Sequence, residues 1–191
     1  MNANVGMVYP VAATVQTYTP GSSISYKSGS GSNFAEAVSA TLNWERADGH
    51  FYGDDAELDS DNGVLGYTID FEPSGLSDTA RTLLLGETAS SSEYSITNDA
   101  APDVGFGYVR VMRDKGVTKY ESWWFHKLKF GLSSEESRTK ERSIEWRVPT
   151  LNGVGSGVSL DNSGKLKYAI HKSHETLAAA KSWLNSKAGI T

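Results

Sequence analysis

Several stretches of the chain alternate apolar and polar residues with a period of two, which is typical of half-buried β-strands. Four such strands are predicted, over residues 38–45, 64–71, 104–112 and 143–148. Their large apolar residues each share one parity: Val38, Ala40, Leu42 and Trp44; Leu65, Tyr67, Ile69 and Phe71; Phe106, Tyr108 and Met112; Ile144, Trp146 and Val148. We therefore expect these residues to face a core.

The stretch 120–150 predicts two long strands joined by a charged loop, and its first strand is apolar on both parities. One parity carries Tyr120, Trp124, Leu128 and Phe130, and the other carries Trp123 and Phe125. Because both faces are apolar, one must pack inward and the other must meet a second layer or a second molecule. Trp44, Trp124 and Trp146 are expected in the core.

The joining segment, residues 133–142, has no large apolar residue and is dense in charge. Together with the preceding strand it offers a local basic patch of Lys127, Lys129, Arg138, Lys140 and Arg142. Two interpretations stay open for this segment: a solvated hairpin tip, or a loop that takes part in assembly.

Apolar residues at helical spacing predict two helices. Leu76, Ala80, Leu83 and Leu84 share one helical face, with Ser74 or Ser77 as the N-cap and Gly86 beyond the end. A C-terminal helix is expected over residues 173–188, with Ser173 as its N-cap and an apolar stripe of Leu177, Ala180 and Leu184.

The remaining segments predict loops and a division into two parts. Residues 1–19 are expected as an arm or edge strand, and residues 20–33 and 89–102 as loops. Residues 151–157 form a glycine-rich break. We therefore expect a mainly β (α+β) fold, with a β domain over residues 1–153 that begins with an N-terminal arm (1–33), and a C-terminal extension over residues 154–191.

Charge is distributed unevenly along the chain. Residues 1–109 carry three basic and fifteen acidic side chains, a net of −12, whereas residues 110–191 carry fifteen basic and eight acidic, a net of +7. Either the two halves neutralise each other within one fold, or the molecule has an acidic and a basic end. Copies of such a molecule can stack head to tail.

The segment 48–61 is the most acidic, with six carboxylates and no lysine or arginine. It also contains Phe51 and Tyr52 beside Asp54 and Asp55, and exposed aromatic rings are unusual in a purely solvated loop. We expect this loop to contact a partner. The order of calcium ligands in an EF-hand is not met.

No catalytic motif emerges from the rest of the chain. His171 and His174 straddle a predicted helix start without a zinc-protease pattern, and Gly153, Gly155 and Gly157 do not make a dinucleotide fingerprint. The chain has no cysteine and no apolar run of membrane-spanning length. Its first ten residues lack a basic region and an apolar run, so we expect no secretory signal. We expect no enzymatic activity, no cofactor, no metal and no membrane partner.

The order of the motifs resembles a known family. The motifs are the strand ending at Trp44, Phe51–Asp54, GYTIDFEP at Gly66–Pro73, the helix at Leu76–Glu87, GFGYVRVM at Gly105–Met112, the charged loop with Thr139 and Lys140, and SIEWRVPTLNG at Ser143–Gly153. In order and spacing they resemble the major tail (tail tube) proteins of long-tailed bacteriophages with non-contractile tails, especially those of Gram-positive hosts. The resemblance covers residues 35–153.

This resemblance implies a β-sandwich or barrel-like core with one packed helix. Six subunits would form a ring, and rings would stack into the tail tube through which the genome passes. The chain would then be a structural virion protein, assembled in the host cytoplasm. Its partners would be itself, the tape-measure, tail terminator and distal tail proteins, and DNA in transient passage. The alternative is a carbohydrate-binding β-module of a phage adhesin, with Trp123 as the sugar platform.

Two sets of residues follow from the tube interpretation. The inter-subunit candidates are Phe51, Tyr52, Asp54, Asp55, Trp123, Phe125, Lys127, Lys129, Arg138, Lys140 and Arg142. The lumen candidates are Glu45 and Asp70, which lie on the polar parities of two predicted strands. Acidic side chains there would repel the phosphates of passing DNA.

Overall fold

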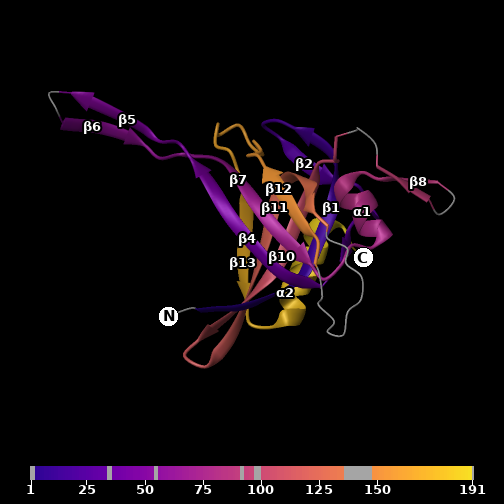
Figure 1. The fold of residues 1–191 in the computed structure, drawn as a ribbon. Helices are drawn as coiled ribbons and strands as arrows, with labels where there is room; N and C mark the ends of the chain where they lie inside the picture. The colour runs from indigo at the N-terminus through magenta and orange to yellow at the C-terminus, as the bar shows by residue number, and fades with distance from the viewer. Residues whose placement is uncertain are drawn as a thin grey trace, which may run out of the picture.

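The computed structural model describes residues 3–33, 36–53, 56–90, 93–96, 100–135 and 148–190, with backbone alone for residues 51–53, 56–60 and 89. The fold is mainly β, as predicted (Figure 1). Its principal sheet is antiparallel and runs in the order β2 (Ser23–Tyr26), β1 (Ala3–Thr19), β10 (Val104–Asp114), β11 (Val117–Ser134), β12 (Thr150–Gly155), β7 (Val64–Pro73) and β4 (Ala37–Arg46).

Smaller elements complete this sheet or project from it. Strand β13 (Ala169–His174) pairs with β11, and β3 (Ser32–Asn33) pairs with β1. Strand β4 also contacts β1, so the sheet curls into a barrel-like shape. Two hairpins lie outside it: β5 (Gly49–Gly53) with β6 (Ala56–Asp61), and β8 (Thr88–Ser90) with β9 (Glu93–Ser95). The β5–β6 hairpin extends far from the barrel (Figure 1).

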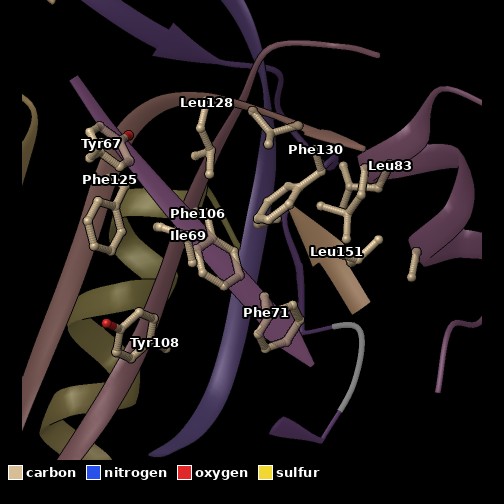
Figure 2. Close-up of a cluster of buried hydrophobic side chains, with 14 residues drawn as sticks. Tyr67, Ile69, Phe71, Leu83, Phe106, Tyr108, Phe125, Leu128, Phe130 and Leu151 are labelled. Carbon is tan, nitrogen blue, oxygen red and sulfur yellow. The ribbon is translucent and has the colours of Figure 1, made fainter. Parts of the chain in front are cut away.

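The inner face of the sheet forms an aromatic core (Figure 2). Its large members are Tyr67, Ile69, Phe71, Phe106, Tyr108, Phe125, Leu128, Phe130 and Leu151. Burying each of these side chains contributes roughly 1.5–3 kcal/mol. Rings meet edge to face, as where Phe106 and Phe130 have centroids 5.2 Å apart and planes at 80°.

Helix α1 (Asp78–Leu85) packs on this core, as its spacing predicted. Ser77 is the N-cap, and its side chain accepts a hydrogen bond from the amide of Ala80 at 3.2 Å. Ala80, Leu83 and Leu84 are buried, and Gly86 ends the helix in the left-handed region at φ 74°.

The outer face of β1, β10 and β11 is covered by helix α2 (Leu177–Ala188). Ala180, Leu184 and Ala188 pack there on a second cluster that includes Trp124. The second layer required by the doubly apolar strand is thus this chain's own helix. Phe125, expected at a contact between subunits, is instead fully buried in the inner core, so that prediction is wrong.

The predicted parity of β11 fails at a bulge. The register runs from Phe106–Phe125 to Val104–Leu128, so β11 has one residue more than β10 over this interval. The extra residue reverses the facing of the strand beyond it. Leu128 and Phe130 therefore share the inner face with Phe125, not the outer face with Trp124.

Bulges and strand ends also account for the misplaced residues of β4 and β7. Val38 and Leu65 lie at register irregularities of the β4–β7 pair and are 55% and 65% exposed. Trp44, expected in the core, is 36% exposed. Trp44 pairs with Tyr67, and Tyr67 pairs in turn with Gly155, the last residue of β12. Trp44 therefore lies at the end of the sheet.

Several predicted loops are strands. Residues 1–19, expected as an arm or edge strand, contribute β1, an interior strand flanked by β10 on one side and by β2 and β3 on the other. The acidic segment 48–61 is a hairpin, and residues 89–102 contain part of another. The glycine-rich break is β12, where a Cβ at Gly155 would collide with the ring of Tyr67.

The C-terminal helix begins later than predicted. Ser173 belongs to β13, and the N-cap is Thr176, whose hydroxyl accepts from the amide of Ala179. Residues 169–188 thus join the sheet and cover it. The division of the chain at residue 153 stays a prediction. Thr139, Lys140, Ile144 and Trp146 lie outside the described residues.

Candidate functional site

The face of β4, β7 and β12 that points away from the aromatic core is polar. Two cross-strand rows lie on it: Thr41, Asp70, Asn152 and Gly131, and Asn43, Thr68, Val154 and Lys129. The amide of Asn152 donates to the Asp70 carboxylate at 2.7 Å. The two described helices pack elsewhere, α1 on the inner core and α2 on the outer face of β1, β10 and β11, so this face is a surface on which polar groups are fixed by the sheet.

Glu45 and Asp70 share this polar face. Asp70 pairs with Thr41, and Glu45 pairs with Gly66, which puts both carboxylates on the parity opposite Tyr67 and Ile69. Glu72, which accepts a hydrogen bond from the Ser39 hydroxyl at 2.7 Å, adds a third acid. These three acids outnumber the basic side chain of Lys129 on the same face, so the described part of the face is predominantly acidic.

The base of the β5–β6 hairpin is well defined. The amide of Ala47 donates to the carbonyl of Gly63 at 2.8 Å, and the Arg46 guanidinium donates to the carbonyl of Asn62 at 3.3 Å. The Asp61 carboxylate accepts from the amide of Gly63 at 2.9 Å. These bonds direct the hairpin away from the barrel (Figure 1). Asp54 and Asp55, and the side chains of Phe51 and Tyr52, lie outside the described residues.

The predicted basic patch is partly neutralised within the chain. The ammonium of Lys127 lies 3.3 Å from the Asp103 carboxylate, and that of Lys129 lies 4.0 Å from it. Lys127 also lies 5.3 Å from the centroid of the Tyr18 ring. Arg138, Lys140 and Arg142 are outside the described residues. The two lysines therefore offer less positive charge to a partner than the sequence suggested.

Trp123 lies in a polar cluster beside β13. The His171 ring stacks on its indole at 4.8 Å, and the Arg110 guanidinium lies 5.0 Å from its centroid. Its Nε1 donates to Glu121 Oε2 at 2.7 Å, and Glu121 also faces His171 Nδ1 at 3.1 Å. Trp123 is half-buried, and two neighbours already lie over its ring. This packing leaves less of the indole for a sugar than an open platform would.

A shallow cavity that the sequence did not indicate lies where β7 extends beyond β12. Its volume is about 420 Å³, and it is lined by Trp44, Arg46, Val64, Leu166, Lys167, Tyr168 and Ala169. The Tyr168 hydroxyl donates to the carbonyl of Val64 at 2.6 Å. Lys167 contacts Asp161 at 2.7 Å and holds the pKa of that carboxyl well below its usual range. Three separate segments form this cavity, so no local pattern could reveal it.

Within the described part of the chain, two histidines have a buried Nε2 without a hydrogen-bond partner: His126, which is buried as a whole, and His174, which is half-buried. Burial, with Lys187 and Lys167 nearby, lowers the pKa of His126 to about 4, so its ring is neutral near pH 7.

Among the described residues, no three histidine or carboxylate side chains are placed to hold a metal. Neither described helix has the length and apolar character that a membrane crossing requires. Comparison with protein-family models and with curated proteins finds no match.

Proposed function

We propose that this chain is the major tail protein of a long-tailed bacteriophage, a structural virion subunit that forms hexameric rings stacked into the tail tube. This proposal starts from the order of motifs over residues 35–153. The mainly β, barrel-like sheet with α1 packed on its core is the kind of fold that the resemblance implies. Under this proposal the chain is not an enzyme.

The observation that carries the proposal is the β5–β6 hairpin. It projects from the barrel, and its segment, residues 48–61, has six carboxylates, two aromatic residues and no lysine or arginine. Like charges close together repel, and a projecting hairpin adds nothing to the barrel core. A projecting hairpin of this kind is suited to binding a neighbouring subunit, and a subunit of a stacked tube needs such a contact.

The polar face of β4, β7 and β12 supports a lumen role. Glu45 and Asp70 lie on the same face, and the two described helices pack elsewhere, α1 on the inner core and α2 on β1, β10 and β11. A conduit for DNA must avoid binding phosphates, and fixed acidic side chains keep them away. We therefore place this face toward the lumen.

The proposal also names partners and a location. The tube would end on tail terminator and distal tail proteins, enclose the tape-measure protein during assembly and later pass the DNA. The protein would be assembled in the host cytoplasm and reside in the virion tail.

Electron microscopy of the purified protein tests the proposal. We expect rings or tubes from the wild-type chain. A variant with residues 48–61 replaced by a short Gly/Ser linker should keep its circular dichroism spectrum and thermal transition but form no tubes. High salt should weaken assembly of the intact protein, because exposed charges are screened. A wild-type protein that stays monomeric at all concentrations contradicts the proposal.

The cavity beside Trp44 favours a second candidate, a carbohydrate-binding module. Trp44 is partly exposed, and its ring lies 6.1 Å from that of Tyr168 at 90°. Aromatic faces and polar side chains such as Arg46 are suited to binding sugars. Titration with oligosaccharides, read by tryptophan fluorescence, distinguishes the two candidates. Saturable binding that is lost in Trp44→Ala, by a protein that stays monomeric, would favour this one.

A further inference from the structure

The turn between β10 and β11 presents positive charge at the end of a long hairpin. Asp114 pairs with Val117, and the two residues between them, Lys115 and Gly116, have φ of 48° and 88°. Positive φ at both central residues makes this a tight two-residue turn. The tip therefore holds its charged side chains on a rigid support.

Three cations gather at this tip, namely Arg113, Lys115 and Lys119, and all three are exposed. Arg113 pairs with Thr118 and Lys119 with Met112, so these two side chains lie on opposite faces of the hairpin. Within the described part of the chain, none of the three contacts a carboxylate closely enough for an ion pair. Lys127, Lys129 and Lys167, in contrast, have such partners.

Apolar surface accompanies the charge. Val117, in the turn itself, is 58% exposed. Strand β1 pairs with β10 next to this tip, with Ala3 opposite Arg113. Val5 of β1 lies at a register irregularity and is 59% exposed. The tip thus combines cations with two exposed valines, and a partner of acidic and aromatic character would satisfy both.

We propose that the tip formed by Arg113, Lys115, Val117 and Lys119 is the surface on which the β5–β6 hairpin of a second copy docks. That hairpin segment carries six carboxylates, which are opposite in charge to the cations of the tip. It also carries Phe51 and Tyr52, whose rings are suited to contact with the exposed valines. The two hairpins diverge from the barrel in Figure 1, so the contact joins different copies. This inference rests on the proposed self-assembly and identifies the surface that receives the acidic hairpin.

The contact is heterologous, because each copy contributes a different surface. Such contacts continue from copy to copy and build rings or filaments. The charges set orientation and rate of association, whereas the aromatic side chains on the valines supply contact area. Each exposed ion pair contributes little by itself, so several are needed along a repeating interface.

Complementation between two defective variants tests the inference. The tip variant is Arg113→Glu, Lys115→Glu and Lys119→Glu. The hairpin variant neutralises the six acids of residues 48–61 as Asn or Gln. A matched control, Lys27→Glu, Lys165→Glu and Lys172→Glu, makes the same charge change at other exposed lysines. Sedimentation velocity and electron microscopy report the size of the particles formed.

At protein concentrations where the wild type polymerises, each defective variant alone should stay at one unit, a monomer or a single ring. Polymerisation of either variant should need at least about tenfold more protein. The control should polymerise as the wild type does. A 1:1 mixture of the two defective variants should give particles of twice the unit mass, because one intact tip meets one intact hairpin.

The outcomes separate this inference from the proposed function. Normal tubes from the tip variant, or a mixture that stays at one unit, overturn the inference while the tube proposal stands. A wild-type chain that never associates overturns both.

Discussion

The hydroxyl of Tyr26 accepts a hydrogen bond from Nε1 of Trp124 at 3.0 Å, and the two rings meet edge to face with centroids 5.2 Å apart. The same hydroxyl donates to the carbonyl of His126 at 2.9 Å. Burial raises the pKa of Tyr26 to about 12, so the hydroxyl remains a donor. One side chain from a Gly/Ser-rich segment thus satisfies two polar groups at the bulge of β11.

Tyr26→Phe should therefore destabilise the fold. It leaves the indole N–H and a carbonyl without their partner while the ring contact survives, and a buried unsatisfied polar group costs about 1–3 kcal/mol. Chemical denaturation measures the free energy of unfolding. Tyr94→Phe, at an exposed tyrosine, is the control and should change it little. Equal stabilities of the two variants would show that water replaces the lost hydroxyl at no net loss.

His126 should make stability depend on pH. Its folded pKa is about 4, below the ordinary 6.5, so the unfolded chain binds the proton more readily. The corresponding stability is present in full above about pH 6.5 and is lost as pH falls toward about 4. Between pH 7 and 5.5 this one group accounts for a loss of about 1 kcal/mol.

His126→Gln removes this titration and is the variant to compare. Denaturant unfolding at several pH values should show a flatter profile for the variant over that interval, whatever its stability at pH 7. Parallel profiles for the two proteins would mean that His126 is protonated in the fold without penalty.

Helix α2 should be essential to stability. Leu184 is fully buried against the outer face of the sheet, so Leu184→Ala should lower the free energy of unfolding by about 2–5 kcal/mol. Leu166→Ala makes the same chemical change at an exposed position and should have a small effect. A thermal transition that Leu184→Ala does not shift would mean that the helix detaches from the sheet without consequence.

Charge on the polar face should govern the passage of DNA. Glu45→Lys with Asp70→Lys reverses two acids on that face, so tubes should still form but should retain DNA at low salt. Glu93→Lys with Glu175→Lys, at exposed positions elsewhere, is the matched control. Co-sedimentation of tubes with DNA measures the difference. A tube structure with both side chains on its outer wall would end this idea.

The sequence by itself determined the mainly β class, helix α1 with its caps and most of the inner core, because these follow from local periodicity and helix capping. Tyr67, Ile69, Phe71, Phe106 and Tyr108 share the predicted face since their strands are regular between them. The same alternation placed Glu45 and Asp70 on a common polar face.

Only the tertiary structure decided where that alternation breaks and what covers each face. One extra residue in β11 reverses the facing of Leu128 and Phe130, and no composition signal marks it. Trp44 is partly exposed, and it lies at the end of the sheet, level with Gly155, the last residue of β12. Phe125 is enclosed, and Trp124 is covered by α2, which lies some 60 residues further along the chain. Such contacts depend on how distant segments meet in space, and a local pattern does not contain that information.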